Sequence, residues 1–349
     1  MTAEIPAIQV NKKGSNTNTG RPGVAGKIAV VGAFKTEVTE PQLFLTADEA
    51  KEALGTDDTF DGCKVIDDLF IGASSLLAVN VATKSGTTWT KTVDATNLAA
   101  ALAKIKGEDW DMLFVAATLT DSLIPVIDSY LDDTFEMKFP AGYGGCLNGA
   151  NTAANVTSAG LAGDHCYFLL TQQLIVNGTT KSLLNSAAYY MGMLAAMQVG
   201  NTMTMKEVPG VNGVTPELGF ETGQAGKAYV EAGITTVKPI NRNDGRYVVV
   251  NSEQPNGLDL YINRVRDFVI KEMNMIQFLG DRNRTPTHNQ ILQECDRIEY
   301  KCVTTLDLLS DIEYNVEKTG PKTVDVNLSS LTFDDIITKI NINYTIEVQ

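Results

Sequence analysis

The middle of the chain alternates between short, continuous apolar runs and longer stretches in which apolar residues recur every three or four positions. Short continuous runs are typical of strands buried on both faces, and the longer period is typical of helices. The alternation predicts an α/β domain with a largely parallel sheet over residues 96–235. The expected strands are 112–117 and 165–171, and the expected helices are 96–105, 122–131 and 182–198.

Small residues gather on the last of these helices. They are Ala187, Ala188, Gly192, Ala195 and Ala196. Small side chains let a helix approach its neighbour closely, so we expect this face to pack tightly against the sheet.

The first part of the chain is predicted to be richer in strands. Apolar runs at 28–32 and 73–81 indicate buried strands, and 47–54 has helical spacing. These elements form the expected N-terminal β-rich unit, residues 23–95. Ahead of it, Ile8 and Val10 have the spacing of a short strand, and a polar, glycine-bearing stretch follows them. We therefore expect residues 1–22 to be an N-terminal arm, a strand on a flexible tether.

The C-terminal part combines a hairpin with two long helices. Asp244-Gly245 between two β-branched runs is a strong hairpin signal, and Thr285-Pro286 supplies an N-cap hydroxyl followed by a first-turn proline. These features predict a C-terminal α+β domain, residues 236–335. Its expected elements are strands at 235–240 and 247–251, helices at 259–280 and 285–309, and a strand at 324–328.

Strict alternation of apolar and polar residues runs to the last position of the chain. The apolar members are Ile340, Ile342, Tyr344, Ile346 and Val348. A period of two predicts a half-buried strand, and we expect residues 336–349 to form a C-terminal strand arm.

Composition narrows the class of protein. The 349 residues are 44% hydrophobic and 20% charged, as in folded globular proteins, and the net charge of -14 opposes binding to nucleic acid. The first ten residues lack the pattern of a signal peptide, and the longest apolar stretch is too short to cross a bilayer. We expect a soluble protein made in the cytoplasm, without nucleic-acid or membrane partners.

Residues able to bind a metal are few and badly spaced. The five cysteines form no CxxC pair, and the only histidines are His165 and His288. His288, Cys295 and Cys302 share one helical face, but ligands two turns apart are too distant for a single ion. We expect the cysteines to act as small buried apolar residues, His165 to be structural, and no metal to be bound.

Motifs for nucleotide binding and hydrolysis are also absent. In Gly23-Val24-Ala25-Gly26-Lys27-Ile28 the lysine is followed by Ile28 instead of Ser or Thr, and the glycines from Gly142 to Gly149 do not form GxGxxG. No GxSxG elbow occurs. Adjacent carboxylates such as Asp57-Asp58, Asp67-Asp68 and Asp132-Asp133 lack EF-hand spacing, and we interpret them as solvated faces. We expect no catalytic residue and no cofactor.

Positive charge is concentrated in the C-terminal third. Of the eight arginines, only Arg21 lies outside the range Arg242 to Arg297. Arg264, Arg266, Arg282 and Arg284 bracket the long helix. Ordinary pairing on a helix surface, as for Arg266 and Asp267, is one interpretation, and a basic patch facing an acidic partner is the other.

In the order of its elements the chain resembles the contractile-tail sheath proteins of bacteriophages and R-type bacteriocins. The resemblance lies in the helix 187–200 with the loop Gly210-Val211-Asn212-Gly213, in Ala232-Gly233-Ile234 leading to 244–249, in the two long helices and in the closing strand. It covers most of the length, and the first 95 residues match weakly.

The resemblance implies a structural role. Sheath subunits stack helically around an inner tube and contract to drive it through a target envelope, and tail terminator and baseplate proteins are further partners. It also implies that residues 96–235 form a subtilisin-like sheath domain without a protease triad, and that both arms add strands to sheets of neighbouring subunits. On this basis the basic patch is expected to face the tube, and the protein to pass from the bacterial cytoplasm into a virion tail or a released particle.

Two other classes of protein stay open. An α/β enzyme with an unrecognised active site requires a perturbed titratable group in a deep pocket. A surface-layer or adhesin-like assembly protein requires export.

Overall fold

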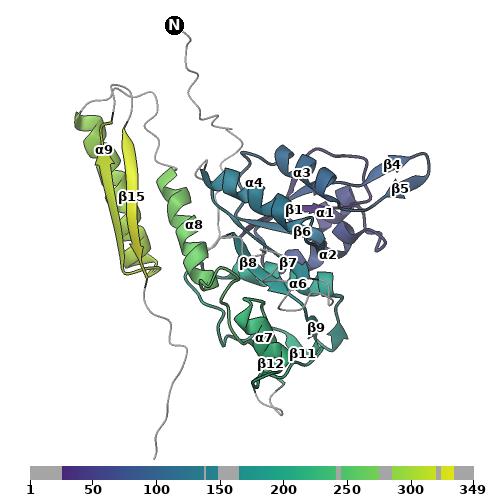
Figure 1. Cartoon of the computed structure of the whole chain (residues 1–349). Coiled ribbons are helices and arrows are strands. Elements are labelled where there is room, and N and C mark those ends of the chain that lie inside the picture. Colours follow the sequence, from purple (N-terminus) through teal and green to yellow (C-terminus); the bar gives the residue numbers. More distant parts are fainter. Residues whose placement is uncertain are drawn as a thin grey trace, which may run out of the picture.

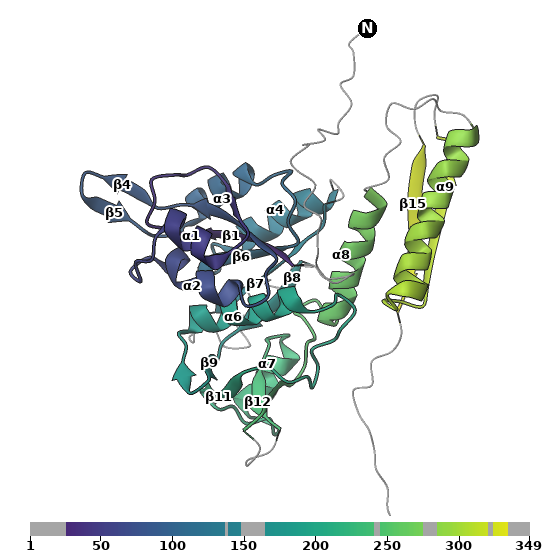
Figure 2. The same ribbon diagram turned by 180° about the vertical axis from the view of Figure 1, so that it is seen from behind.

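The computed structural model describes residues 26–136, 139–147, 165–240, 245–274, 285–319 and 324–333. It has two parts, which we call the body, up to residue 259, and the C-terminal unit, residues 285–333. Helix α8 (Leu260–Asn274) stands between them in both views (Figures 1 and 2). Both expected strand arms lie outside the described residues.

A six-stranded sheet forms the centre of the body, in the order β2-β3-β1-β6-β7-β8. Strand β1 pairs in parallel with β3 and β6, and the parallel ladder continues through β7 to β8, whereas β2 is an antiparallel edge strand. The predicted, largely parallel sheet is thus confirmed. The strands are β1 (Lys27–Gly32), β2 (Gln42–Phe44), β3 (Ser75–Asn80), β6 (Met112–Leu119), β7 (Gly142–Leu147) and β8 (Cys166–Leu170).

Helices cover both faces of this sheet (Figure 1). Helices α2 (Asp61–Leu69) and α6 (Leu183–Ala196) pack on one face, and α3 (Ala95–Lys104) and α4 (Ile124–Glu136) lie on the other. Helix α1 (Ala47–Leu54) packs beside α2. A capping box starts α3: Asp94 accepts hydrogen bonds from the backbone of Thr96 and Asn97, and Asn97 accepts one from the backbone of Asp94.

Glycines permit two close approaches in the body. A Cβ atom at Gly142 or Gly144 of β7 would lie 2.1 Å or 2.0 Å from the aromatic ring of Tyr167 or Phe168 on β8. A Cβ at Gly192 of α6 would lie 2.3 Å from the carbonyl oxygen of Asp68, at the end of α2. Helix α6 does contact the sheet, as expected, but the close approach at Gly192 is to the helix α2.

The apolar core of the body extends across two of the expected domain boundaries, those at residues 95 and 235. The sheet joins β1 and β3 to β6, β7 and β8, so residues 26–95 and 96–235 share one sheet and one apolar core across the boundary at residue 95. The hairpin of β12 (Val237–Pro239) and β13 (Tyr247–Val249), assigned to the C-terminal domain, also contributes to that core. The reason is tertiary: the buried Gln172 side chain holds both backbone groups of Val237.

Smaller elements complete the body. A three-stranded sheet has the order β10-β9-β11, and β4 pairs with β5. The bounds are β4 (Thr83–Ser85), β5 (Thr88–Thr90), β9 (Gln173–Val176), β10 (Thr179–Thr180), β11 (Val211–Thr215) and α7 (Ala225–Glu231).

The C-terminal unit is a helix packed on a hairpin. Helix α9 (Thr285–Glu299) continues as the π-helix η1 (Tyr300–Thr305), where a single helix to residue 309 was expected. Strands β14 (Asp311–Glu317) and β15 (Asp325–Thr332) pair antiparallel, and β14 contacts α9. No helix in the described ranges is long and apolar enough to span a membrane.

Candidate assembly interface

Metal ligands and thiols are the first candidates for a functional site. In the described ranges, no group of three or more His, Cys, Asp or Glu side chains is placed to hold a metal ion. All five cysteines are free and buried. Burial raises the pKa of Cys146, Cys295 and Cys302 to about 11, so these thiols are protonated and unreactive near neutral pH.

His165 is a buried side chain at the start of β8. Its Nε2 lies 3.1 Å from an Asp132 carboxylate oxygen on α4, and its ring lies 5.5 Å from the ring of Phe135. The histidine thus joins α4 to the sheet, in keeping with the structural role expected from the sequence.

The other motifs considered from sequence also have structural placements. Lys27 belongs to β1 and pairs with Asp109, while Gly142, Gly144 and Gly145 lie inside the strand β7. Among the acidic pairs, separate lysines pair with Asp57, Asp67 and Asp133, and His165 pairs with Asp132. Asp68 departs from the expected solvated face: it is buried and accepts hydrogen bonds from Lys181 at 2.6 Å and Asn185 at 2.7 Å.

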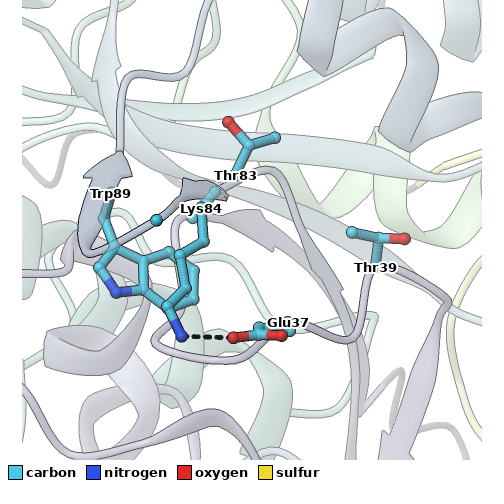
Figure 3. Close-up of a pocket in the computed structure, with 7 residues that line it drawn as sticks. Glu37, Thr39, Thr83, Lys84 and Trp89 are labelled. Carbon is cyan, nitrogen blue, oxygen red and sulfur yellow. Dashed lines mark hydrogen bonds and ion pairs between the residues drawn. The ribbon is translucent and has the colours of Figure 1, made fainter.

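A shallow pocket of about 450 Å³ lies beside the β4–β5 hairpin (Figure 3). Lys84 pairs with Glu37 at its edge, and the Lys84 ammonium lies 5.5 Å from the centre of the Trp89 ring. The two charged side chains that line the pocket therefore pair with each other.

Arg264 contradicts the expected basic patch. The side chain is 2% exposed, and its Nη2 donates to the carbonyl oxygens of Leu194 and Met197, each at 3.0 Å. These carbonyls end α6, where the negative end of the helix dipole attracts a cation. The Leu194 carbonyl also accepts a hydrogen bond from the Met197 backbone N–H. Arg264 is therefore an internal anchor of α8 and cannot meet an external surface in this conformation.

The other members of the patch are only partly described. Arg266 is half-buried, donates to Asp267 at 3.0 Å and lies 5.4 Å from the centre of the Phe135 ring. This matches the alternative of local pairing for Arg266. Arg282 and Arg284 lie outside the described residues.

The β14–β15 hairpin is the most exposed sheet of the chain's C-terminal part. One face carries Ile312, Tyr314 and Leu328, which pack in the apolar cluster of the C-terminal unit. The other face is polar, with residues such as Glu313, opposite Ser330 in the ladder. Within the described residues neither outer edge of this two-stranded sheet pairs with a third strand.

Such an edge offers unpaired backbone donors and acceptors to an added strand. Sequence reasoning did not assign β14, although Ile312, Tyr314 and Val316 alternate with polar residues at the spacing that predicts a strand. The expected strand arms, with Ile8, Val10, and Ile340 to Val348, lie outside the described residues, so the structure does not place them beside the hairpin.

Comparison with known proteins identifies the fold. No protein-family model and no curated protein sequence matches the chain. Among solved structures, the sheath tail protein from Desulfitobacterium hafniense matches with a TM-score of 0.69 at 12% identity, covering 94% of this chain and 97% of that one. The sheath tail protein Lin1278 from Listeria innocua matches with a TM-score of 0.63 at 11% identity, covering 88% and 96%.

A third structure comes from an assembled particle. The helical sheath of the anti-feeding prophage, in its contracted state, matches with a TM-score of 0.68 at 13% identity. The match covers 98% of this chain and 99% of the sheath chain. Because these similarities extend over nearly the whole length of both partners, the chain has the fold of tail sheath proteins.

Proposed function

We propose that the protein is the structural subunit of a contractile tail sheath, which polymerises helically around an inner tube and contracts to drive the tube through a target envelope. The observation that carries the proposal is the full-length similarity to the sheath chain of a contracted helical assembly.

The proposed assembly uses the two strand arms. Ile8 and Val10 near the start, and Ile340 to Val348 at the end, have the alternation of strands that cover an apolar face. In the proposal these arms add to sheet edges of neighbouring subunits, and the β14–β15 hairpin supplies a receiving edge. Strand addition uses backbone hydrogen bonds, so it tolerates rotation of the bodies that it links.

The proposal also names partners and a location. The inner tube protein would line the lumen of the sheath, and baseplate and tail terminator proteins would contact its two ends. Another similar chain belongs to the anti-feeding prophage baseplate, with a TM-score of 0.68, which supports contact at the baseplate end. Subunits would assemble in the bacterial cytoplasm and then belong to a virion tail or a released particle.

Electron microscopy of the purified chain in negative stain, together with analytical sedimentation, tests the proposal. We expect tubes or rings with open helical symmetry, because strands that pair head to tail with a neighbour do not close on themselves. A monomer at every concentration, with no tube or ring even when an inner tube is supplied, would contradict it.

A further inference from the structure

Helix α8 has two faces with different chemistry. One face carries Asn263, Arg264, Asp267 and Lys271 and lies against the body. The other carries Tyr261, Val265 and Val269 and lies in the apolar cluster of the C-terminal unit. The helix thus contacts the body through directional polar groups and the C-terminal unit mainly through apolar side chains.

The polar face is held at three points along its length. Arg264 donates to the carbonyls that end α6, at 3.0 Å. One turn later, the Tyr167 hydroxyl of β8 donates to Asp267 at 2.8 Å, and one turn after that Lys271 donates to Asp111 at 2.8 Å and to the Trp110 carbonyl.

These contacts fix the position of α8 on the body. Asn263, Arg264 and Asp267 are at most 3% exposed, and Asn263 donates to the Gln254 side chain. Leaving a buried polar group without its partner costs more free energy than the hydrogen bond itself contributes. A slide of α8 across the body would leave several such groups unpaired and is therefore unfavourable. Dispersion and burial on the apolar face carry no comparable directional requirement.

The core of the C-terminal unit is completed by residues outside the unit. Its apolar cluster contains ten buried residues, of which Tyr261, Val265 and Val269 come from α8 and Val199 from the body. Polar contacts across this junction include the ion pair of Lys301 with Glu272, at 2.7 Å, a hydrogen bond from Gln198 to the Leu306 carbonyl, at 3.1 Å, and the Lys301 ammonium 5.2 Å from the centre of the Phe268 ring. We call this junction the α8 seam.

We propose that α8 moves as part of the body and that the subunit opens at the α8 seam, releasing the C-terminal unit while the body stays folded. The seam separates the part that carries the β14–β15 hairpin from the part that carries the central sheet. The inference concerns the single subunit, so it does not depend on the proposed sheath function.

Hydrogen–deuterium exchange of the full chain, followed by mass spectrometry, tests the proposal. We expect amides of α8 to exchange as slowly as those of β6, and amides of α9, β14 and β15 to exchange at least tenfold faster than both. Exchange of α8 together with α9, well ahead of β6, would overturn the assignment of α8 to the body.

The native cysteines provide an independent measurement of the same opening. Cys146 in the body and Cys302 in the C-terminal unit are both 0% exposed, and burial raises the pKa of both thiols to about 11. With exposure and pKa matched, the labelling rate reports mainly how often each site opens. We expect a thiol reagent to label Cys302 at least tenfold faster than Cys146, and equal rates would contradict opening at the seam.

A matched pair of substitutions locates the weak junction. Val269→Ala removes two methyl groups from the seam, and Val115→Ala does the same in β6, where the side chain is also buried. Val269→Ala should speed labelling of Cys302 at least tenfold and leave Cys146 unchanged, whereas Val115→Ala should speed labelling of Cys146 and change that of Cys302 little, because Cys302 is already reached through the seam. If Val269→Ala speeds both thiols equally, the subunit opens as a single unit and the proposal is wrong.

Discussion

The body and the C-terminal unit are both made of helices packed on strands, but they obtain their stability in different ways. In the body, helices cover both faces of a six-stranded sheet, and β3 has every residue buried. In the C-terminal unit, α9 packs on one face of a two-stranded sheet, and α8 supplies part of the core. Because four of the ten buried residues in its apolar cluster come from α8 and the body, the C-terminal unit depends on its neighbours for a complete core.

This difference matters for assembly. The hairpin proposed to receive a neighbour's strand belongs to the part with the smaller core. A third or fourth strand would widen this sheet and raise its stability. Polymerisation would therefore stabilise the C-terminal unit relative to the single subunit.

The largest effect is expected from removing the C-terminal arm. Deletion of residues 339–349 should abolish tubes or rings while leaving a folded, soluble monomer, because the body core found among the described residues is built from residues 28–260. Circular dichroism and light scattering distinguish this from the alternative that the strand closes its own sheet. In that case loss of five buried side chains, at about 1.5–3 kcal/mol each, would leave a molten or insoluble protein.

Leu309→Ala should strongly destabilise the C-terminal unit. Leu309 is 3% exposed in the apolar cluster, and truncating a buried leucine costs about 2–5 kcal/mol. Hydrogen–deuterium exchange measured across a urea series should show that the loss of stability is confined to residues 285–333. The matched control is Leu292→Ala, since Leu292 lies on α9 and is 43% exposed, and a change within about 0.5 kcal/mol is expected there.

Gly192→Ala should destabilise the body by about 1–3 kcal/mol, even though alanine is the better helix former. The added Cβ would lie 2.3 Å from the Asp68 carbonyl oxygen, and that backbone cannot move away without shifting α2. Ala100→Ser, which also adds one heavy atom but at an exposed position of α3, should change stability by less than about 0.5 kcal/mol. A more stable Gly192→Ala variant in thermal unfolding would show that propensity outweighs packing.

Asp111 links pH to the junction between α8 and the body. Burial alone would raise the pKa of this carboxyl, but Lys271 and the backbone of Lys27 outweigh burial and hold the pKa below its ordinary value. The ionised Asp111 carboxylate therefore contributes fully to the free energy of unfolding above the pKa of about 3.9 that an aspartate has in the unfolded chain. This contribution is lost as the pH falls through the lower pKa of Asp111 in the folded protein.

Asp111→Asn should accordingly lower stability by about 1–2 kcal/mol at pH 7 and by progressively less below pH of about 4. Urea midpoints across this pH range provide the measurement, with Asp121→Asn, an exposed carboxyl of the body, as the control. A penalty for Asp111→Asn that does not shrink in acid would contradict an ionised Asp111–Lys271 pair.

The body was largely predictable because its signals are local. Residues 47–54 were expected to be helical and form α1 with those bounds, and the apolar run 112–117 lies within β6. Strand β7 was missed because Gly142 and Gly144 give it no hydrophobic pattern. Their role depends on the rings of Tyr167 and Phe168, which come from another strand.

The candidate site was less predictable, for a related reason. An arginine on a long helix is normally assigned to the surface, and only the position of the α6 carboxyl end makes burial of Arg264 favourable. The pairing of β1 with β6 across residue 95 was unpredictable for a similar reason, because the order of strands in a sheet is a non-local property. β14 differs from these cases, since the alternation of Ile312, Tyr314 and Val316 was a sufficient local signal.

The smallest effect is expected from the arginines that remain candidates for a patch facing the tube. With Arg264 buried and Arg266 paired to Asp267, the proposal now rests on Arg282 and Arg284, which follow α8 in sequence. Exposed charges contribute about 1 kcal/mol or less each, but repetition over every subunit would hold an extended sheath on an acidic tube. Arg282→Glu with Arg284→Glu should therefore cause early contraction, or failure to assemble on the tube, and make extended particles less stable at low salt. Arg297→Glu, an exposed change on α9 where Arg297 pairs with Glu294, is the control expected to leave assembly intact. Electron micrographs of both variants across a salt series give the fraction of extended particles at each salt concentration. Extended particles with unchanged salt sensitivity would show that these arginines do not contact the tube.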